Sequence, residues 1–159
     1  MKKFIMKMLS MISPRSLEIV DQEKTTLEDS VICSQKKFDG FNFDLLAEKD
    51  RVLISVWELE AEINNGGFDQ YYFNSSGNLA HFAPLALDLI GASKMSDIVR
   101  RANSVFGKAG PSQNWETRQG QLESALSKDA GIFEQFGLEF YGYPDDLETL
   151  LTRYISNSD

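Results

Sequence analysis

The sequence predicts an all-α fold, a compact single-domain array of several helices. Apolar residues recur every three or four positions through most of the 159 residues, which is the spacing of amphipathic helices. The four prolines are widely spaced, and no internal repeat, low-complexity tract or linker divides the chain. A chain of this length buries about 69% of its open-chain surface on folding, which suffices for one ordinary core.

Residues 1–15 are predicted to be a basic amphipathic segment that precedes a single helical domain over residues 16–159. The segment contains four basic residues and no acid, and its apolar residues have helical spacing. The basic residues are Lys2, Lys3, Lys7 and Arg15, and the apolar ones are Phe4, Ile5, Met8, Leu9 and Ile12. Lys7 interrupts the apolar run, and the run is too short to cross a bilayer. We therefore expect a short helix docked on the domain or a frayed tail, with a weak membrane-surface helix as the alternative, and neither a signal peptide nor a membrane span.

The first half of the domain contains the strongest predicted helix. Residues 16–40 stay unassigned, because Leu17–Val20 fits either a short strand or a helical turn. A helix is predicted over Asp44–Asn64, where apolar side chains form one continuous stripe. The stripe consists of Leu45, Leu46, Val52, Leu53, Val56, Trp57, Leu59 and Ile63. The helix should end at the run Asn64–Gly67, since Asn and Gly adopt the left-handed C-cap conformation at low cost, and a short helical turn over Phe68–Phe73 should follow.

Four more helices are predicted from the same spacing. The first two are Leu79–Ile90, opened by Asn78 and closed by Gly91, and Met95–Phe106, capped by Ser93 or Ser96 and ended by Gly107. The third begins at Pro111 and Ser112 with Trp115, Leu122 and Leu126 on one face, and the last is Asp145–Ile155 with Leu147, Leu150, Leu151 and Tyr154 inward. The aromatic-rich stretch Ile132–Tyr143 is expected to pack the final helix onto the core, with a ligand-binding box as the alternative.

The chemical inventory excludes several classes of site. A single cysteine, Cys33, rules out an internal disulfide and cysteine-rich zinc motifs, and a single histidine, His81, rules out two-histidine metal centres. Ser75 and Ser76 lie in no nucleophile-elbow pattern, and no phosphate-binding glycine motif is present. The inventory leaves a carboxylate metal site and a single-histidine base open, and our expectation is no cofactor, no metal and no enzymatic activity. The single cysteine and the missing signal pattern indicate a cytoplasmic protein.

Charge is unevenly distributed along the chain. The 16 basic and 24 acidic residues give a net charge of −8, and because residues 1–15 carry +4, the remainder carries −12. Such a domain is not expected to bind nucleic acid directly, because phosphate contacts need a basic face. A basic protein partner fits this charge, and so does simple solubility.

Acidic residues in two regions are the candidate partner-binding groups. Residues 58–93 contain five acids and no Lys or Arg, and residues 109–159 contain nine acids and three bases. The candidates are Glu123, Glu134, Glu139, Asp145, Asp146 and Glu148, followed by Glu58 and Glu62. They bind a partner only if the fold gathers them on one face. The alternative for Asp145, Asp146 and Glu148 is helix stabilisation, since acids in a first turn interact favourably with the helix dipole.

The stretch Glu60–Gly77, with the sequence EAEINNGGFDQYYFNSSG, is the least generic part of the chain. Glu60 falls inside the apolar stripe, where an unpaired charge is costly, so it is either at a frayed helix end or paired with nearby amides. The candidate amides are Asn64, Asn65, Gln70 and Asn74. One interpretation is a polar network that fixes a helix–turn–helix corner. The other is a polar ligand or catalytic site in which the Gly66 and Gly67 amides bind an anion.

Glu58 and Glu62 lie one helical turn apart. Together with Asp69 or His81 they have the composition of a metal site. Paired carboxylates at this spacing are far more often a solvated helix face, which is the interpretation we adopt.

The stretch EINNGGFDQYYFNSSGNLAHFAPLALDLIGA resembles the signature of a bacterial family of domains of unknown function, and GYPDDLETLLTRYI resembles that family's closing helix. The specific part has the pattern NGGFxQYxxN. Its residues are Asn65, Gly66, Gly67, Phe68, Gln70, Tyr71 and Asn74, with Glu60 just before them. The family includes a dimeric DNA mimic that occupies the DNA-binding face of a transcription factor. The resemblance implies an all-α domain without a known cofactor or established enzymatic activity, and a homodimer.

Net charge alone is too dilute for DNA mimicry. Duplex DNA presents roughly one charge per 100 Å². The 24 acids, spread over about 8,000 Å² of surface, give only one per ~330 Å². Mimicry therefore requires acids to gather on one face, or two such faces to join in a dimer.

We accordingly expect a small, non-enzymatic acidic protein that binds the basic surface of a DNA-binding protein such as a transcription factor. One alternative is a polar small-ligand or catalytic site at the Glu60–Asn74 corner. Another is a toxin-neutralising interaction protein, which is also small and acidic.

Overall fold

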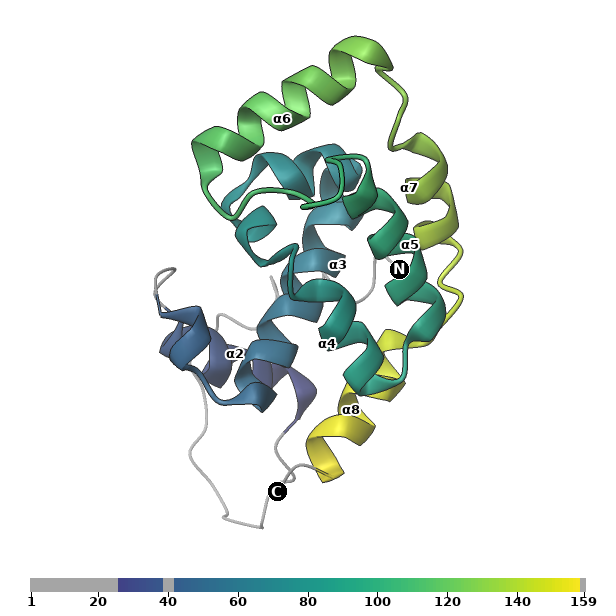
Figure 1. Cartoon of the computed structure of the whole chain (residues 1–159). Coiled ribbons are helices and arrows are strands. Elements are labelled where there is room, and N and C mark those ends of the chain that lie inside the picture. The colour runs from purple at the N-terminus through teal and green to yellow at the C-terminus, as the bar shows by residue number, and fades with distance from the viewer. Residues whose placement is uncertain (1–25, 39–41, 158–159) are drawn as a thin grey trace, which may run out of the picture.

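The structure is a computed structural model that describes residues 26–38 and 42–157 (Figure 1). These residues form seven α-helices and two short 3-10 helices, with no strand among them, so the all-α prediction is confirmed. The basic segment 1–15 and the ambiguous Leu17–Val20 lie outside the described residues. None of the helices described is long and apolar enough to cross a membrane.

Helix α3 is the long central element, and α2 packs against its first half (Figure 1). α2 (Leu27–Lys37) begins with a capping box, in which the Thr26 hydroxyl accepts from the Asp29 amide and the Asp29 carboxylate accepts from the Thr26 amide. A buried hydrogen bond of 2.6 Å from Ser34 Oγ to Asp50 Oδ1 then joins α2 to α3. Residues 26–38, which the sequence left unassigned, are therefore mostly helical.

Helix α3 (Glu48–Phe73) follows the short 3-10 helix η1 (Phe43–Leu45). The predicted start of this helix is wrong, and Leu45 is 88% exposed instead of lying in the apolar stripe. The reason is that the chain turns at Leu46 and Ala47, whose backbone is not helical, before α3 begins. From Val52 to Ile63 the stripe is confirmed, and its aliphatic side chains are buried.

Helix α3 is kinked at Gly66 and Gly67, whose backbone angles are not helical. Gly67 has a φ of 78°, a conformation that costs glycine far less than other residues. The helix then resumes at Phe68. The predicted break at Asn64–Gly67 and the helical turn beyond it are both confirmed.

The segment predicted as one helix over Leu79–Ile90 is split. Its first residue, Leu79, ends the 3-10 helix η2 (Ser75–Leu79), a turn follows over residues 80–82, and α4 (Ala83–Ile90) begins only afterwards. Pro84 lies in the first turn of α4, where its missing N–H leaves no hydrogen bond unmade, so Asn78 does not open this helix. Gly91 ends α4 with a left-handed φ of 88°, as predicted.

The remaining helices are α5 (Ser93–Ser104), α6 (Trp115–Lys128), α7 (Glu134–Tyr141) and α8 (Leu147–Asn157). Asn114 caps α6 by accepting from the Thr117 amide, so this helix begins later than predicted. On the face predicted to carry apolar side chains, Leu122 is buried, whereas Trp115 is 48% exposed. Within the aromatic stretch, α7 packs chiefly on α3 and α5 rather than on the final helix.

An aromatic cluster fills the core between the second half of α3 and α7. Phe68 stacks on Phe133 with ring centroids 6.5 Å apart and meets Phe140 edge-on at 6.0 Å. Tyr72 contacts Phe106 and Phe133 in the same cluster. Because buried aromatic rings contribute large apolar areas, these contacts fix α7 beside the kink.

Helix α6 lies at one end of the molecule, and α2 and α8 at the other (Figure 1). It is attached to the C-terminal end of α3 through Arg118, which is fully buried. Arg118 donates from Nε to the Tyr72 carbonyl (2.7 Å) and from Nη2 to the Asn74 carbonyl (3.0 Å). The last carbonyls of a helix carry partial negative charge, so they suit a buried cation. Sequence patterns did not predict this contact.

Candidate functional site

A pocket of about 530 Å³ opens between α2, α3 and α8, next to the kink of α3. Among the residues that the structure describes, its lining includes four carboxylates and no Lys or Arg. Two of these acids, Glu60 and Glu62, come from α3, whereas Asp146 and Glu148 come from the start of α8. We call this feature the acidic pocket. Its volume lies in the range typical of small-molecule sites.

Hydrogen bonds across the kink hold one wall of the acidic pocket. Oε2 of Glu62 accepts from Nε2 of Gln70 (2.6 Å) and from Nδ2 of Asn74 (2.9 Å). Gly66 permits the approach of Gln70, because a Cβ at position 66 would lie 2.2 Å from Oε1 of Gln70. The polar network that was predicted for this corner is therefore present, with Glu62 rather than Glu60 at its centre.

Glu60 is half-buried and has a partner from a distant part of the chain. The Tyr143 hydroxyl donates to Oε1 of Glu60 (2.9 Å) and accepts from Nδ2 of Asn64 (2.6 Å). The expectation that Glu60 is paired is confirmed, but its predicted amide partners are wrong. Asn65 is exposed at the rim of the pocket, and Gln70 serves Glu62 instead.

The other residues of the NGGFxQYxxN pattern have structural positions. Phe68 and Tyr71 are buried in the core. The Gly67 backbone forms the kink beside Tyr141, whose hydroxyl donates to the carbonyl of Ile63 (2.8 Å). Only part of the pattern therefore faces the pocket.

Like charges crowd the acidic pocket and its surroundings. Burial raises the pKa of Glu60, and the nearby charge of Glu148 raises it further. Burial likewise raises the pKa of Glu58, with the charge of Glu62 adding to the effect. In the part of the chain that the structure describes, no Lys or Arg forms an ion pair with any of the acids named in this paragraph.

Glu58 and Glu62 are not the solvated pair that their spacing suggested. Both are partly buried, and Gln35 of α2 donates to Oε1 of Glu58 (3.1 Å). Within the described ranges no group of three metal-ligating side chains occurs, so neither Asp69 nor His81 completes such a cluster.

The structure brings some of the candidate partner-binding acids together. Glu62, Asp146 and Glu148 line the acidic pocket, and Glu58 lies next to Glu62. Asp146 also caps α8, since its carboxylate accepts from the Thr149 amide (3.1 Å) and hydroxyl (2.7 Å). These hydrogen bonds lower the pKa of Asp146, so it stays charged.

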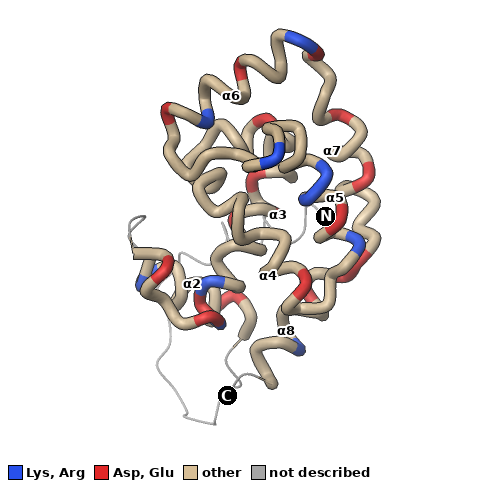
Figure 2. The backbone as a smooth tube through the Cα atoms, viewed as in Figure 1, with Lys and Arg blue, Asp and Glu red and all other residues tan. Residues whose placement is uncertain are grey.

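Acidic residues occur on all seven described helices, so the negative charge as a whole is not confined to one face (Figure 2). Glu123 is exposed on α6, away from the pocket lining. Glu134 is exposed on α7, and its charge contributes to a raised pKa of Asp69 that is caused mainly by burial.

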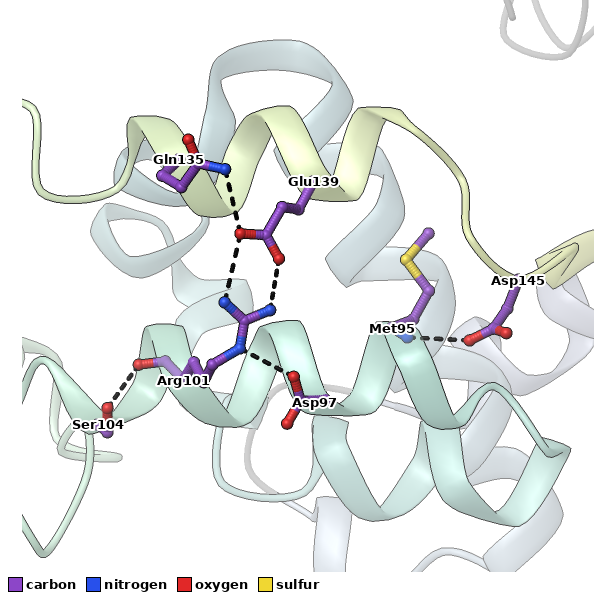
Figure 3. A network of polar contacts seen from close by, with 7 residues as sticks. All are labelled: Met95, Asp97, Arg101, Ser104, Gln135, Glu139 and Asp145. Atoms are coloured by element: carbon purple, nitrogen blue, oxygen red, sulfur yellow. Dashed lines mark hydrogen bonds and ion pairs between the residues drawn. The ribbon is translucent and has the colours of Figure 1, made fainter.

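Glu139 and Asp145 are engaged in contacts that hold the C-terminal part onto α5 (Figure 3). Arg101 forms ion pairs with Asp97 (2.8 Å) and Glu139 (2.5 Å), and its hydrogen bond to Glu139 keeps the pKa of that carboxyl low. Asp145 Oδ2 accepts from the backbone amides of Lys94 (2.8 Å) and Met95 (2.9 Å) at the start of α5.

The cap predicted for this helix, Ser93 or Ser96, is therefore wrong. Ser96 donates instead to the carbonyl of Pro84 (2.8 Å). Asp145 takes the capping position from outside the helix, and its favourable interaction is with the N-terminus of α5.

Comparison with known proteins gives one family. Residues 44–158 match the model of a family described as DMP19-like protein, a range that includes α3 with its kink, the acidic pocket's four carboxylates and α8. No curated protein and no solved structure matches the chain. Since the family match spans well over half of the sequence, the chain belongs to the DMP19-like protein family.

Proposed function

We propose that this protein is a non-enzymatic DNA mimic, which occupies the basic surface of a DNA-binding protein such as a transcription factor. The observation that carries the proposal is the acidic pocket, where four carboxylates meet and where the described residues contribute no Lys or Arg to the lining. Membership of the DMP19-like family supports it, since that family suggests a DNA-mimic protein.

The electrostatics of the pocket favour a cationic partner. The raised pKa values of Glu58 and Glu60 indicate that negative charge is held there against burial and against neighbouring acids. A basic surface relieves this repulsion when it binds, and the uneven charge steers the approach of such a partner. Salt weakens both effects, because at ~0.1 M the attraction between exposed charges more than about 10 Å apart is largely screened.

The test is capture of partners on the tagged protein from its own cell lysate, with elution in salt steps. We expect a basic DNA-binding protein that is released at moderate salt and displaced by duplex DNA. A salt-resistant partner that does not bind DNA would contradict mimicry and favour a toxin-neutralising or other interaction protein.

A pair of variants assigns the binding surface. Glu148→Lys should weaken binding about tenfold, because an attractive charge in the pocket lining becomes repulsive. The matched control is Glu116→Lys, at an exposed acid outside the pocket lining, and it should bind almost normally. Equal losses in both variants would mean that net charge, not the acidic pocket, determines binding.

A polar small-ligand site is the second candidate function, and the pocket itself favours it. Glu60 and Gln70 both line the cavity, whereas Asn74 is not part of the lining and donates a hydrogen bond to Glu62. Asn74→Ala should therefore lower stability, and a loss of ligand binding beyond that would support this candidate.

A homodimer, in which two acidic surfaces join, also remains part of the proposal, and sedimentation measures it directly.

A further inference from the structure

We propose that the acidic pocket receives an arginine side chain of the protein partner. The guanidinium would meet the carboxylates, and the stem and flat face of the side chain would pack on the apolar lining. That the arginine comes from a DNA-binding protein rests on the proposed function. That the pocket binds an arginine side chain is tested independently of that function.

The carboxylates of the pocket have acceptor capacity that the described part of the chain does not use. The carboxylate of Glu148 accepts no hydrogen bond from the described residues; only its backbone carbonyl accepts one, from the Thr152 hydroxyl (2.8 Å). Glu60 accepts through Oε1 alone and Glu62 through Oε2 alone, so each retains an oxygen for an incoming donor. A guanidinium carries five N–H donors and no acceptor, which matches this surplus.

The remaining lining distinguishes arginine from other cations. Leu27, Trp57, Leu147 and Leu151 contribute apolar surface to the same pocket. Arginine has an apolar stem and a weakly hydrated planar head that stacks on aromatic rings, and tryptophan is the strongest such ring. A divalent metal ion instead prefers a shell of oxygen ligands, and the ammonium of lysine is a strongly hydrated point charge.

The pocket is accessible from outside. Ala61 and Asn65, both in its lining, are exposed, as are Asp146 and Glu148 at the start of α8. A side chain that projects from a partner's surface can therefore enter without rearrangement of the helices. This geometry suits a protein-borne arginine.

The test is a titration of the full-length, isotope-labelled protein with a blocked Gly-Arg-Gly peptide, followed by NMR. The control peptide contains citrulline, which has nearly the shape of arginine without its charge. We expect the arginine peptide to shift the indole signal of Trp57 and the amide signals of Gly66 and Gly67 to saturation. Trp115, which is outside the pocket lining, is the internal reference and should not shift.

Two conservative variants complete the experiment. Glu148→Gln should weaken the arginine peptide about tenfold, since it removes a charge-assisted contact without altering an internal hydrogen bond of the described structure. Glu116→Gln, at an exposed position on α6, should leave the affinity unchanged. A Gly-Lys-Gly peptide should bind more weakly than the arginine peptide.

Several results would overturn the proposal. Equal shifts from the citrulline peptide would show that the pocket does not recognise charge, and equal binding of the lysine peptide would remove the preference for guanidinium. Shifts of Trp115 as large as those of Trp57 would indicate diffuse attraction. Specific arginine binding without a DNA-displaceable partner would leave the pocket assignment standing and contradict mimicry. A DNA-displaceable partner together with a pocket that does not respond to the arginine peptide would support mimicry and contradict the pocket assignment.

Discussion

Glu60 combines burial, a hydrogen bond from Tyr143 and the repulsive charge of Glu148, and burial is the largest of these influences on its raised pKa. A carboxyl whose pKa is higher in the folded than in the unfolded protein binds protons more readily when folded. Its contribution to stability is therefore fully present below the unfolded pKa and is lost as the pH rises through the folded pKa. At neutral pH the charged Glu60 weakens the fold.

Glu60→Gln should consequently stabilise the protein at pH 7, by about 0.5 kcal/mol. The amide oxygen of glutamine still accepts from Tyr143, so only the charge is removed. The advantage should shrink as the pH falls toward 4.5, the ordinary pKa of a glutamate, because wild-type Glu60 then becomes protonated too. Urea unfolding over this pH range measures the difference. A stabilisation that does not vary with pH would contradict the charge-based explanation.

Gly66 has a steric role that a substitution exposes. Gly66→Ala places a Cβ 2.2 Å from Oε1 and 2.9 Å from Cβ of Gln70, so Gln70 must move and its hydrogen bond to Glu62 is lost. We expect a loss of about 2 kcal/mol in the free energy of unfolding. Gly120→Ala in α6, where no atom lies within 4 Å of the added Cβ, should instead stabilise by about 0.5–1 kcal/mol. Denaturant titrations of both variants give the comparison, and equal effects would contradict this role.

At the scale of the element, apolar periodicity predicted the interiors of the helices better than their ends. It identified the buried stripe of α3, and the Asn–Gly run identified the kink, because both signals are local in sequence. The starts of helices depended on contacts that are not local. Asp145 caps α5 from 50 residues beyond it, and no pattern around Ser93 contains that information.

The candidate site was predicted to a similar extent. The position of Glu60 in an apolar stripe required a partner, and the structure provides one. That partner, Tyr143, is 83 residues away in the sequence. Its identity could not be predicted, because it depends on how α7 and α8 pack. Composition also drew attention to Glu139, but only the tertiary contact with Arg101 shows that its charge is already paired.

The attachment of α6 to α3 depends on Arg118. Arg118→Met removes the donors for the carbonyls of Tyr72 and Asn74 inside the protein, and we expect it to lower the free energy of unfolding by about 3 kcal/mol. Arg118→Lys keeps the charge, but a single ammonium cannot reproduce the planar fork, so a smaller loss should remain. Urea unfolding distinguishes them. A methionine variant as stable as the wild type would show that these contacts contribute little.

At the scale of the whole molecule, α3 connects the parts that lie at opposite ends. It contacts α2, α4, α6, α7 and η2, so few groups of helices can separate without exposing its buried side chains. The aromatic cluster and the fully buried Arg118 of α6 pack against the second half of α3. Asp50 and the stripe from Val52 belong to its first half. This continuity supports the prediction that residues 16–159 fold as a single domain.

Unfolding of the protein should therefore be one cooperative transition. The two tryptophans report on different regions, since Trp57 lines the acidic pocket and Trp115 lies on α6 with its indole N–H donating to the Phe73 carbonyl. Trp57→Phe and Trp115→Phe each leave one fluorescent probe. In each variant the remaining tryptophan and the far-UV circular dichroism should give the same midpoint in urea, as two-state unfolding requires. If the Trp115 probe unfolds at lower urea than the helical signal while the Trp57 probe does not, α6 is a separate unit and the single-domain prediction is wrong.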